Sequence, residues 1–131
     1  MSYHHEINIR VYYQDTDAQG VVYHANYLNF AERGRAEFLR SRDDAFNNLV
    51  LGQGLTVVAR HMEIEYLAAA RLDDVIRLVT YAGDLRSTSF VVHSDAYLND
   101  KLINKVKMTG VLVNKEWKPV RLSEELRAAL L

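Results

Sequence analysis

Two aspartates stand two residues apart in the stretch Asp15-Thr16-Asp17-Ala18-Gln19-Gly20, which combines carboxylates with a turn-forming glycine. Alternating acidic residues of this kind also open the loops that bind calcium in EF-hands. A twelve-residue calcium loop that starts at Asp15 needs an oxygen ligand at its fifth position and a bidentate Glu at its twelfth, where this chain has Gln19 and Asn26. Neither residue supplies the missing negative charge. The sequence therefore excludes an EF-hand calcium site.

Paired aspartates after a strand also occur in phosphotransferases. That chemistry needs a parallel α/β sheet and a magnesium site assembled from further loops. The short loops that connect the strands of this chain indicate antiparallel pairing instead, because a parallel crossover needs about a dozen residues. The order of the elements thus excludes the phosphotransferase interpretation.

Composition narrows the class of protein. The chain has 131 residues, of which 49% are hydrophobic, so one domain over residues 1–131 with a substantial core is expected. Its formal net charge of −1 gives no electrostatic indication of a nucleic-acid partner. The absence of Cys excludes disulfides and thiolate metal sites. Without an apolar signal core in the first ten residues or a membrane-spanning run, a soluble cytoplasmic protein without membrane insertion is expected.

The periodicity of apolar residues predicts one strand, one long helix, and then a series of strands. Alternation predicts the strands, a helical stripe predicts the long helix, and Ser123 followed by two Glu residues predicts the start of a short C-terminal helix. The predicted ranges are a strand over 6–13, helices over 26–41 and 44–51, and strands over 58–66, 74–82, 87–98 and 102–114. This order predicts an α+β fold with an antiparallel sheet.

Gly34 lies within the apolar stripe of the long helix. A glycine in a helix interior costs about 1 kcal/mol relative to Ala. We therefore expect this helix to pack closely against another backbone, within the concave side of the sheet.

The segment RVYYQDTDAQGVVYHANYLNFAERGRAEFL, residues 10–39, resembles the signature of the 4-hydroxybenzoyl-CoA thioesterase family. It is most similar to the Tol-Pal-associated acyl-CoA thioesterase subgroup, and the likeness continues through MEIEYLAAARLDD, residues 62–74. The resemblance implies a hotdog fold, in which a five-stranded antiparallel sheet wraps around a long central helix. It also implies an acyl-CoA thioesterase that forms a carboxylic acid and free CoA without metal or redox cofactor.

The resemblance assigns roles to residues of the loop and the helix start. Asp17 corresponds to the catalytic carboxylate, acting as nucleophile or as general base for water. The helix opening at 22–26 offers unpaired N-H groups that can hold an oxyanion, and His24 corresponds to the residue whose backbone N-H does so. Asp15, by contrast, is expected to accept backbone N-H bonds within the turn.

Further residues are expected to contact the substrate. Arg86 matches the hairpin that contacts the CoA nucleotide in the family, although a solvated turn arginine is an equal alternative. Members that act on 4-hydroxybenzoyl-CoA have an Asp at the position of Glu32, so the longer Glu disfavours that substrate. The complete set of expected substrate-binding residues is Gly20, Val21, Val22, Tyr23, Glu32 and Arg86.

The partners expected are an acyl-CoA substrate and a second copy of the chain, as a dimer or tetramer, since a hotdog protomer leaves sheet edges uncovered. An acyl carrier protein is a further candidate partner. The alternative function is a non-catalytic module that binds acyl-CoA or acyl carrier protein on the same fold. His61 and His93 lack the spacing of zinc ligands, so no metal site is expected.

Overall fold

The computed structural model describes residues 3–131, so the first two residues of the segment tested for a signal sequence lie outside the described residues. Five strands form one sheet in the order β1-β3-β4-β5-β2, and every neighbouring pair is antiparallel. The bounds are β1 His4–Arg10, β2 Thr56–Tyr66, β3 Val75–Gly83, β4 Ser89–Leu98 and β5 Lys101–Val113. The predicted antiparallel α+β fold is confirmed.

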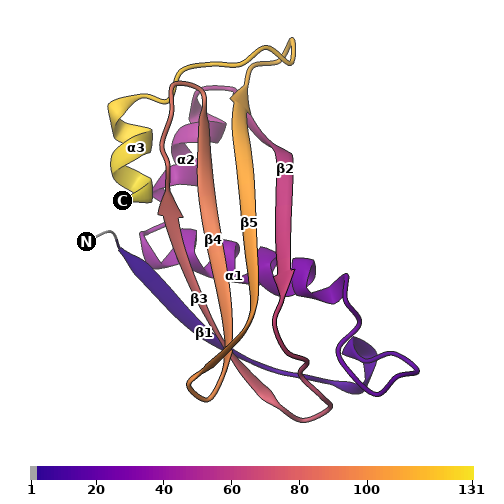
Figure 1. The fold of residues 1–131 in the computed structure, drawn as a ribbon. Coiled ribbons are helices and arrows are strands. Elements are labelled where there is room, and N and C mark those ends of the chain that lie inside the picture. Colours follow the sequence, from indigo (N-terminus) through magenta and orange to yellow (C-terminus); the bar gives the residue numbers. More distant parts are fainter. Residues whose placement is uncertain (1–2) are drawn as a thin grey trace.

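The helix α1, Asn26–Ser41, crosses one face of the curved sheet (Figure 1). Its bounds match the predicted range, because the apolar stripe that made it recognisable is the side that packs: Tyr27, Phe30, Ala31, Gly34 and Phe38 are buried. Two shorter helices, α2 Ala45–Gly52 and α3 Glu124–Leu130, lie together beside one end of the sheet. None of the helices within residues 3–131 is long and apolar enough to cross a bilayer.

Gly34 lies where α1 packs tightly against β3. A Cβ atom added to Gly34 would lie 2.6 Å from both the Leu78 Cδ2 and the Thr80 Oγ1. The expectation of close packing is thus confirmed, but the expected neighbour was wrong, because side chains of β3 rather than a backbone fill the space under the glycine.

The first strand ends earlier than its alternation predicts. Pairing with β3 stops at Arg10, and residues Tyr13–Asp15 form a 3-10 turn in place of further strand. Val11 stays connected, because its N-H donates to the Asp74 carbonyl at 2.8 Å. The turn carries the chain away from the sheet and begins the loop that contains Asp17.

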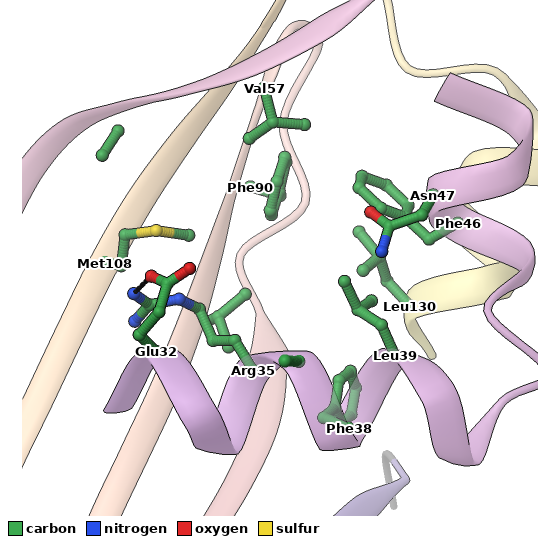
Figure 2. Close-up of a pocket in the computed structure, with 13 residues that line it drawn as sticks. Glu32, Arg35, Phe38, Leu39, Phe46, Asn47, Val57, Phe90, Met108 and Leu130 are labelled. Carbon is green, nitrogen blue, oxygen red and sulfur yellow. Dashed lines mark hydrogen bonds and ion pairs between the residues drawn. The ribbon is translucent and has the colours of Figure 1, made fainter. Parts of the chain in front are cut away.

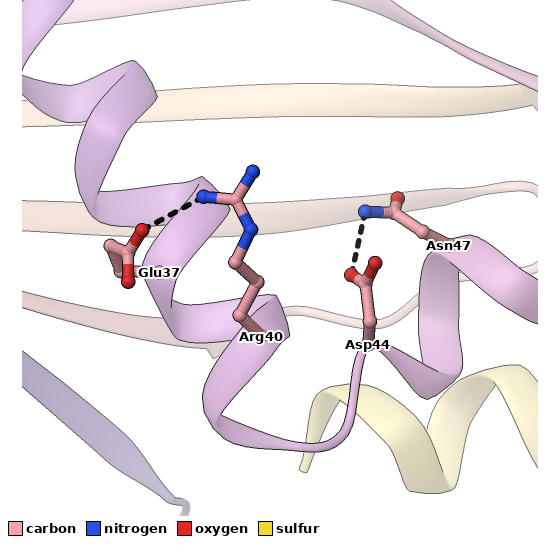
Figure 3. A network of polar contacts seen from close by, with 4 residues as sticks. All are labelled: Glu37, Arg40, Asp44 and Asn47. Carbon is pink, nitrogen blue, oxygen red and sulfur yellow. Dashed lines mark hydrogen bonds and ion pairs between the residues drawn. The ribbon is translucent and has the colours of Figure 1, made fainter.

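The connection between α1 and α2 reverses the chain through two residues in the left-handed region, Asp43 (φ 59°) and Asp44 (φ 54°). Figure 3 shows the polar contacts on either side of it: Arg40 pairs with Glu37 at 2.8 Å, and the Asn47 amide donates to Asp44 at 2.9 Å. Arg42, also in this connection, donates to the Leu131 carbonyl at 2.8 Å. The first two contacts are local to α1 and to the start of α2, whereas the Arg42 contact ties the C-terminal residue to the end of α1.

Candidate active site

The loop between Tyr12 and the start of α1 is closed by backbone hydrogen bonds. Thr16 and Val22 form an antiparallel bridge, the Tyr23 N-H donates to the Asp15 carbonyl at 2.9 Å, and the Asp17 N-H donates to the Val21 carbonyl at 3.0 Å. The loop is therefore a compact, hairpin-like projection that presents residues 17–21 at its tip.

Asp15 is the structural carboxylate of this loop, as predicted. It is only 6% exposed, and its Oδ2 accepts the Tyr12 N-H at 2.8 Å. Its Oδ1 accepts the Asn26 side-chain amide at the same distance. Asp15 thereby joins the strand end to the first residue of α1, and both of its oxygens are occupied.

Asp17 has different surroundings. It is half-buried, and its Oδ1 accepts the Gln19 N-H at 2.8 Å in a tight local turn. An open hollow lies beside it, lined by Tyr13, Thr16, Ala18, Gly20 and Leu72. Gly20 has φ +83°, which a side chain would strain, so the glycine is required for the turn itself. Asp17 therefore lines an open hollow at the surface of the loop.

His24 presents a free backbone donor at the entrance to α1. No hydrogen-bond acceptor contacts its N-H among residues 3–131. The expectation that all N-H groups over 22–26 point outward unpaired was wrong: Val22 donates to Ala70, Tyr23 to Asp15, and Asn26 to Tyr23. The Ala25 N-H likewise has no acceptor among residues 3–131, so the N-H groups of His24 and Ala25 are the donors at the helix start that could bind an oxyanion.

Tyr66 on β2 is a residue of the site that sequence reasoning missed. Its hydroxyl donates to the His24 carbonyl at 2.8 Å, and its ring lies 6.5 Å from the His24 imidazole. The Tyr23 ring also contacts the imidazole, in a tilted arrangement with ring centroids 4.6 Å apart. The available signal was a tyrosine at the end of the strand at 58–66, on the same face as Met62 and Ile64.

Tyr27 lies beneath this part of the loop and packs against the Tyr66 ring at 5.9 Å. Its hydroxyl accepts the Ala70 N-H at 3.3 Å, and burial raises the pKa of Tyr27 above its usual value. Tyr27 therefore remains neutral under ordinary conditions and supports the loop without exchanging protons.

The other predicted substrate-binding residues are spread over the protomer. Val22 is only 4% exposed and packs in the core, whereas Val21 is half-buried and Tyr23 is exposed. Glu32 lies further along α1, where it pairs with Arg35 at 2.6 Å. Arg86 is exposed at the turn between β3 and β4, at the opposite end of the sheet from the Asp17 loop (Figure 1). One protomer therefore does not bring Arg86 and Asp17 together.

Residues 3–131 contain no group of three or more His, Asp or Glu side chains arranged to hold a metal ion. The loop and the helix start bring one carboxylate and a backbone N-H donor onto the same short segment, with Tyr66 beside them. Such an arrangement can attack a carbonyl or activate water, and it can hold the negative charge that develops on the carbonyl oxygen.

Comparison with known proteins shows which family this chain resembles. The profile of the Thioesterase superfamily matches residues 19–102. The acyl-CoA thioesterase YbgC of Haemophilus influenzae is 38% identical over 123 residues, which cover 92% of this chain and 90% of that protein. A crystal structure of a probable thioesterase from Bartonella henselae is 40% identical with a TM-score of 0.80, and covers 92% of this chain and 100% of that one.

A 4-hydroxybenzoyl CoA thioesterase structure superposes with a TM-score of 0.85 and covers 98% of this chain and 99% of that one. At 14% identity, it bears on the fold alone. The expected hotdog fold is confirmed by these likenesses together with the observed sheet order.

Proposed function

This chain belongs to the thioesterase superfamily, and we propose that Asp17 and the backbone N-H of His24 carry out its hydrolysis of an acyl-coenzyme A. The reaction converts the thioester to a carboxylic acid and free CoA. The observation that carries this assignment is a partly exposed carboxylate on the same short loop as an unpaired N-H at a helix start. The similarity to proteins named as acyl-CoA thioesterases supports the substrate class.

The roles of the two groups follow from thioester chemistry. Asp17 attacks the carbonyl carbon as nucleophile, or removes a proton from a water that does so. Negative charge then develops on the carbonyl oxygen, where the His24 N-H and the positive end of the α1 dipole stabilise it. The sulfur leaves as a thiolate without needing a strong acid, so one carboxylate suffices.

Tyr66 restrains His24, the residue whose N-H is the proposed oxyanion donor. Its hydrogen bond to the His24 carbonyl at 2.8 Å fixes the peptide that follows His24, while its ring restrains the imidazole. Gly20 supplies the backbone conformation that brings Asp17 and Val21 together. The imidazole of His24 itself has no chemical role in the proposal.

The test is release of free thiol from acyl-CoA by the wild-type protein and by Asp17→Asn. We expect turnover to fall by at least roughly a hundredfold, which is the lower end for loss of an acid-base group. Asp100→Asn, at an exposed hairpin position, makes the same chemical change away from the loop and should retain activity. Full activity in a folded Asp17→Asn variant would contradict the proposed mechanism.

The alternative is a non-catalytic module that binds acyl-CoA or acyl carrier protein. It predicts acyl-CoA binding by calorimetry with no thiol release by the wild-type protein.

The partners proposed with the hydrolase are a second copy of the chain and, as an alternative acyl donor, an acyl carrier protein in the cytoplasm. The rate of thiol release is compared between acyl-CoA and acyl carrier protein that carry the same acyl group. The faster reaction identifies the preferred acyl donor.

A further inference from the structure

The segment of residues 66–70, which begins with the last residue of β2, holds the candidate active-site loop at two points. The Tyr66 hydroxyl donates to the His24 carbonyl at 2.8 Å, and the Ala70 carbonyl accepts the Val22 N-H at 2.9 Å. The His24 N-H, which is the proposed oxyanion donor, lies between these two contacts along the chain. Its position therefore depends on where the segment 66–70 is held.

This segment is anchored to the sheet and to α1. The N-H groups of Leu67 and Ala68 both donate to the Ile103 carbonyl, at 2.9 and 3.1 Å. Ile103 is passed over in the register between β4 and β5, and the extra residue of such a bulge is left outside the ladder. At the other end of the segment, the Ala70 N-H donates to the Tyr27 hydroxyl at 3.3 Å. The segment is thus fixed to β5 by its middle and to α1 by its last residue.

Tyr27 is the buried end of this series of contacts. Its side chain is nearly inaccessible to solvent, and its ring packs edge-on against the rings of Phe30 and Tyr66, with centroids 5.9 Å apart in both pairs. Ala70 is 0% exposed, so water has no access to replace the hydroxyl as the acceptor of its N-H. The Tyr27 hydroxyl is therefore the group that holds Ala70, and Ala70 in turn holds Val22.

We propose that residues 66–70 position the oxyanion donor, and that Tyr27 is the positioning residue that keeps them in place. The proposal rests on the proposed function, since it concerns the donor assigned there to His24. Oxyanion donors act only at a fixed distance from the reacting carbonyl, and a misplacement of about 1 Å can cost about a hundredfold in rate. Tyr27 does not line the hollow beside Asp17, so its loss should affect the chemical step and leave substrate binding intact.

Tyr27→Phe removes the hydroxyl and keeps the packed ring. Tyr81→Phe is the matched control, because it removes a hydroxyl that donates to Asp95 at 3.0 Å between β3 and β4. Tyr81 pairs with His4, at the end of β1 farthest from the Asp17 loop. The measurements are kcat and KM for thiol release from one acyl-CoA, and hydrogen–deuterium exchange of the backbone amides over 16–25 without substrate. Circular dichroism establishes folding.

We expect Tyr27→Phe to lower kcat and kcat/KM equally, by about tenfold, with KM within about twofold of wild type, because an interaction made only in the transition state is weakened. Amide exchange over 16–25 should be faster, since Val22 loses its fixed acceptor. Tyr81→Phe should match wild type in both measurements. A residue that only stabilises the fold would lower the free energy of unfolding and leave kcat of the folded protein unchanged.

If Tyr27→Phe does not fold, Tyr66→Phe tests the same segment from its other contact, because Tyr66 is 50% exposed and loses only its hydroxyl. Three outcomes overturn the positioning role: wild-type kcat in the folded variant, a change confined to KM, or an equal loss of kcat in Tyr81→Phe. Absence of thiol release from every acyl-CoA by the wild-type protein overturns the proposed function instead. The exchange over 16–25 then still shows whether Tyr27 holds the loop, so the two failures are distinguishable.

Discussion

Asp15 and Asp17 are identical side chains two residues apart, and their surroundings give them opposite roles. Asp15 is buried with both oxygens accepting hydrogen bonds, whereas Asp17 is half-buried and holds only the Gln19 N-H. A carboxylate that is fully occupied stabilises a fold, and one with a free oxygen is available to a substrate.

Asp15→Ala should destabilise the fold. The substitution leaves the Tyr12 N-H and the Asn26 amide without their acceptor, and each unsatisfied donor costs about 1–3 kcal/mol where water cannot replace the partner. The free energy of unfolding in urea measures the loss. Asp100→Ala is the control at an exposed turn and should change little. Equal unfolding free energies for the two variants would contradict the structural role of Asp15.

His24→Ala should be milder than Asp17→Asn, with less than about a tenfold loss of turnover. The variant retains the backbone N-H, the start of α1 and its dipole, and loses only ring contacts with Tyr23 and Tyr66. The turnover of both variants is measured with the same acyl-CoA and compared. If a folded His24→Ala variant were the more damaged of the two, the imidazole would be the catalytic base.

At the scale of the elements, Gly34 is the residue that allows α1 to lie close to the sheet. Gly34→Ala should destabilise the protein by about 1–3 kcal/mol, because the new Cβ meets Leu78 and Thr80 at 2.6 Å and overpacks the contact. Gly52→Ala provides the control, since no atom lies within 4 Å of its added Cβ and Ala is the better helix former. The free energy of unfolding in urea is measured for both variants. An unchanged value in Gly34→Ala would show that α1 can shift away from β3 without cost.

The regular elements could be predicted from the sequence because each has a local signal. The apolar stripe of α1 gives its bounds, and Ser123 caps α3 by accepting the Leu126 N-H at 3.2 Å. The early end of β1 has no such signal, since Val11 continues the alternation while its neighbours turn away from β3.

Contacts between distant segments account for what sequence reasoning missed in the candidate site. The Val22 N-H is paired because the Ala70 carbonyl lies beside it, and Tyr66 meets His24 across a separation of 42 residues. A cavity of about 330 Å³ next to Glu32 likewise depends on how α2 and α3 pack over the sheet (Figure 2). Residue patterns along the chain carry no information about how distant segments pack together.

At the scale of the whole molecule, one protomer leaves a long strand edge unpaired. β2 is an edge strand of eleven residues, and a long edge of this kind is commonly covered by a partner. A two-fold axis that pairs β2 with its copy in antiparallel fashion would place the partner's Arg86 end beside the Asp17 end of the first protomer. We therefore expect light scattering at micromolar concentration to give at least twice 15.1 kDa, and a stable, active monomer would contradict this.

Arg86→Ala should raise KM for acyl-CoA about tenfold and leave kcat nearly unchanged. A contact with a remote phosphate is made equally in the ground state and the transition state, so its loss affects binding alone. Arg33→Ala, at an exposed position of α1, is the control and should behave like wild type. A loss confined to kcat would show that Arg86 does not contact the nucleotide.

Mixed dimers of Asp17→Asn and Arg86→Ala subunits test whether one active site uses both chains. If Arg86 serves the site of its partner, the intact Asp17 of one subunit faces the intact Arg86 of the other, and the second site of the dimer carries both changes. Differently tagged subunits, co-expressed and purified as the heterodimer, should then show the wild-type KM with half the wild-type turnover per dimer. If Arg86 serves its own chain, the only site with Asp17 lacks Arg86, and KM stays as high as in the Arg86→Ala homodimer. The separation of Arg86 and Asp17 at opposite ends of the sheet favours the first result.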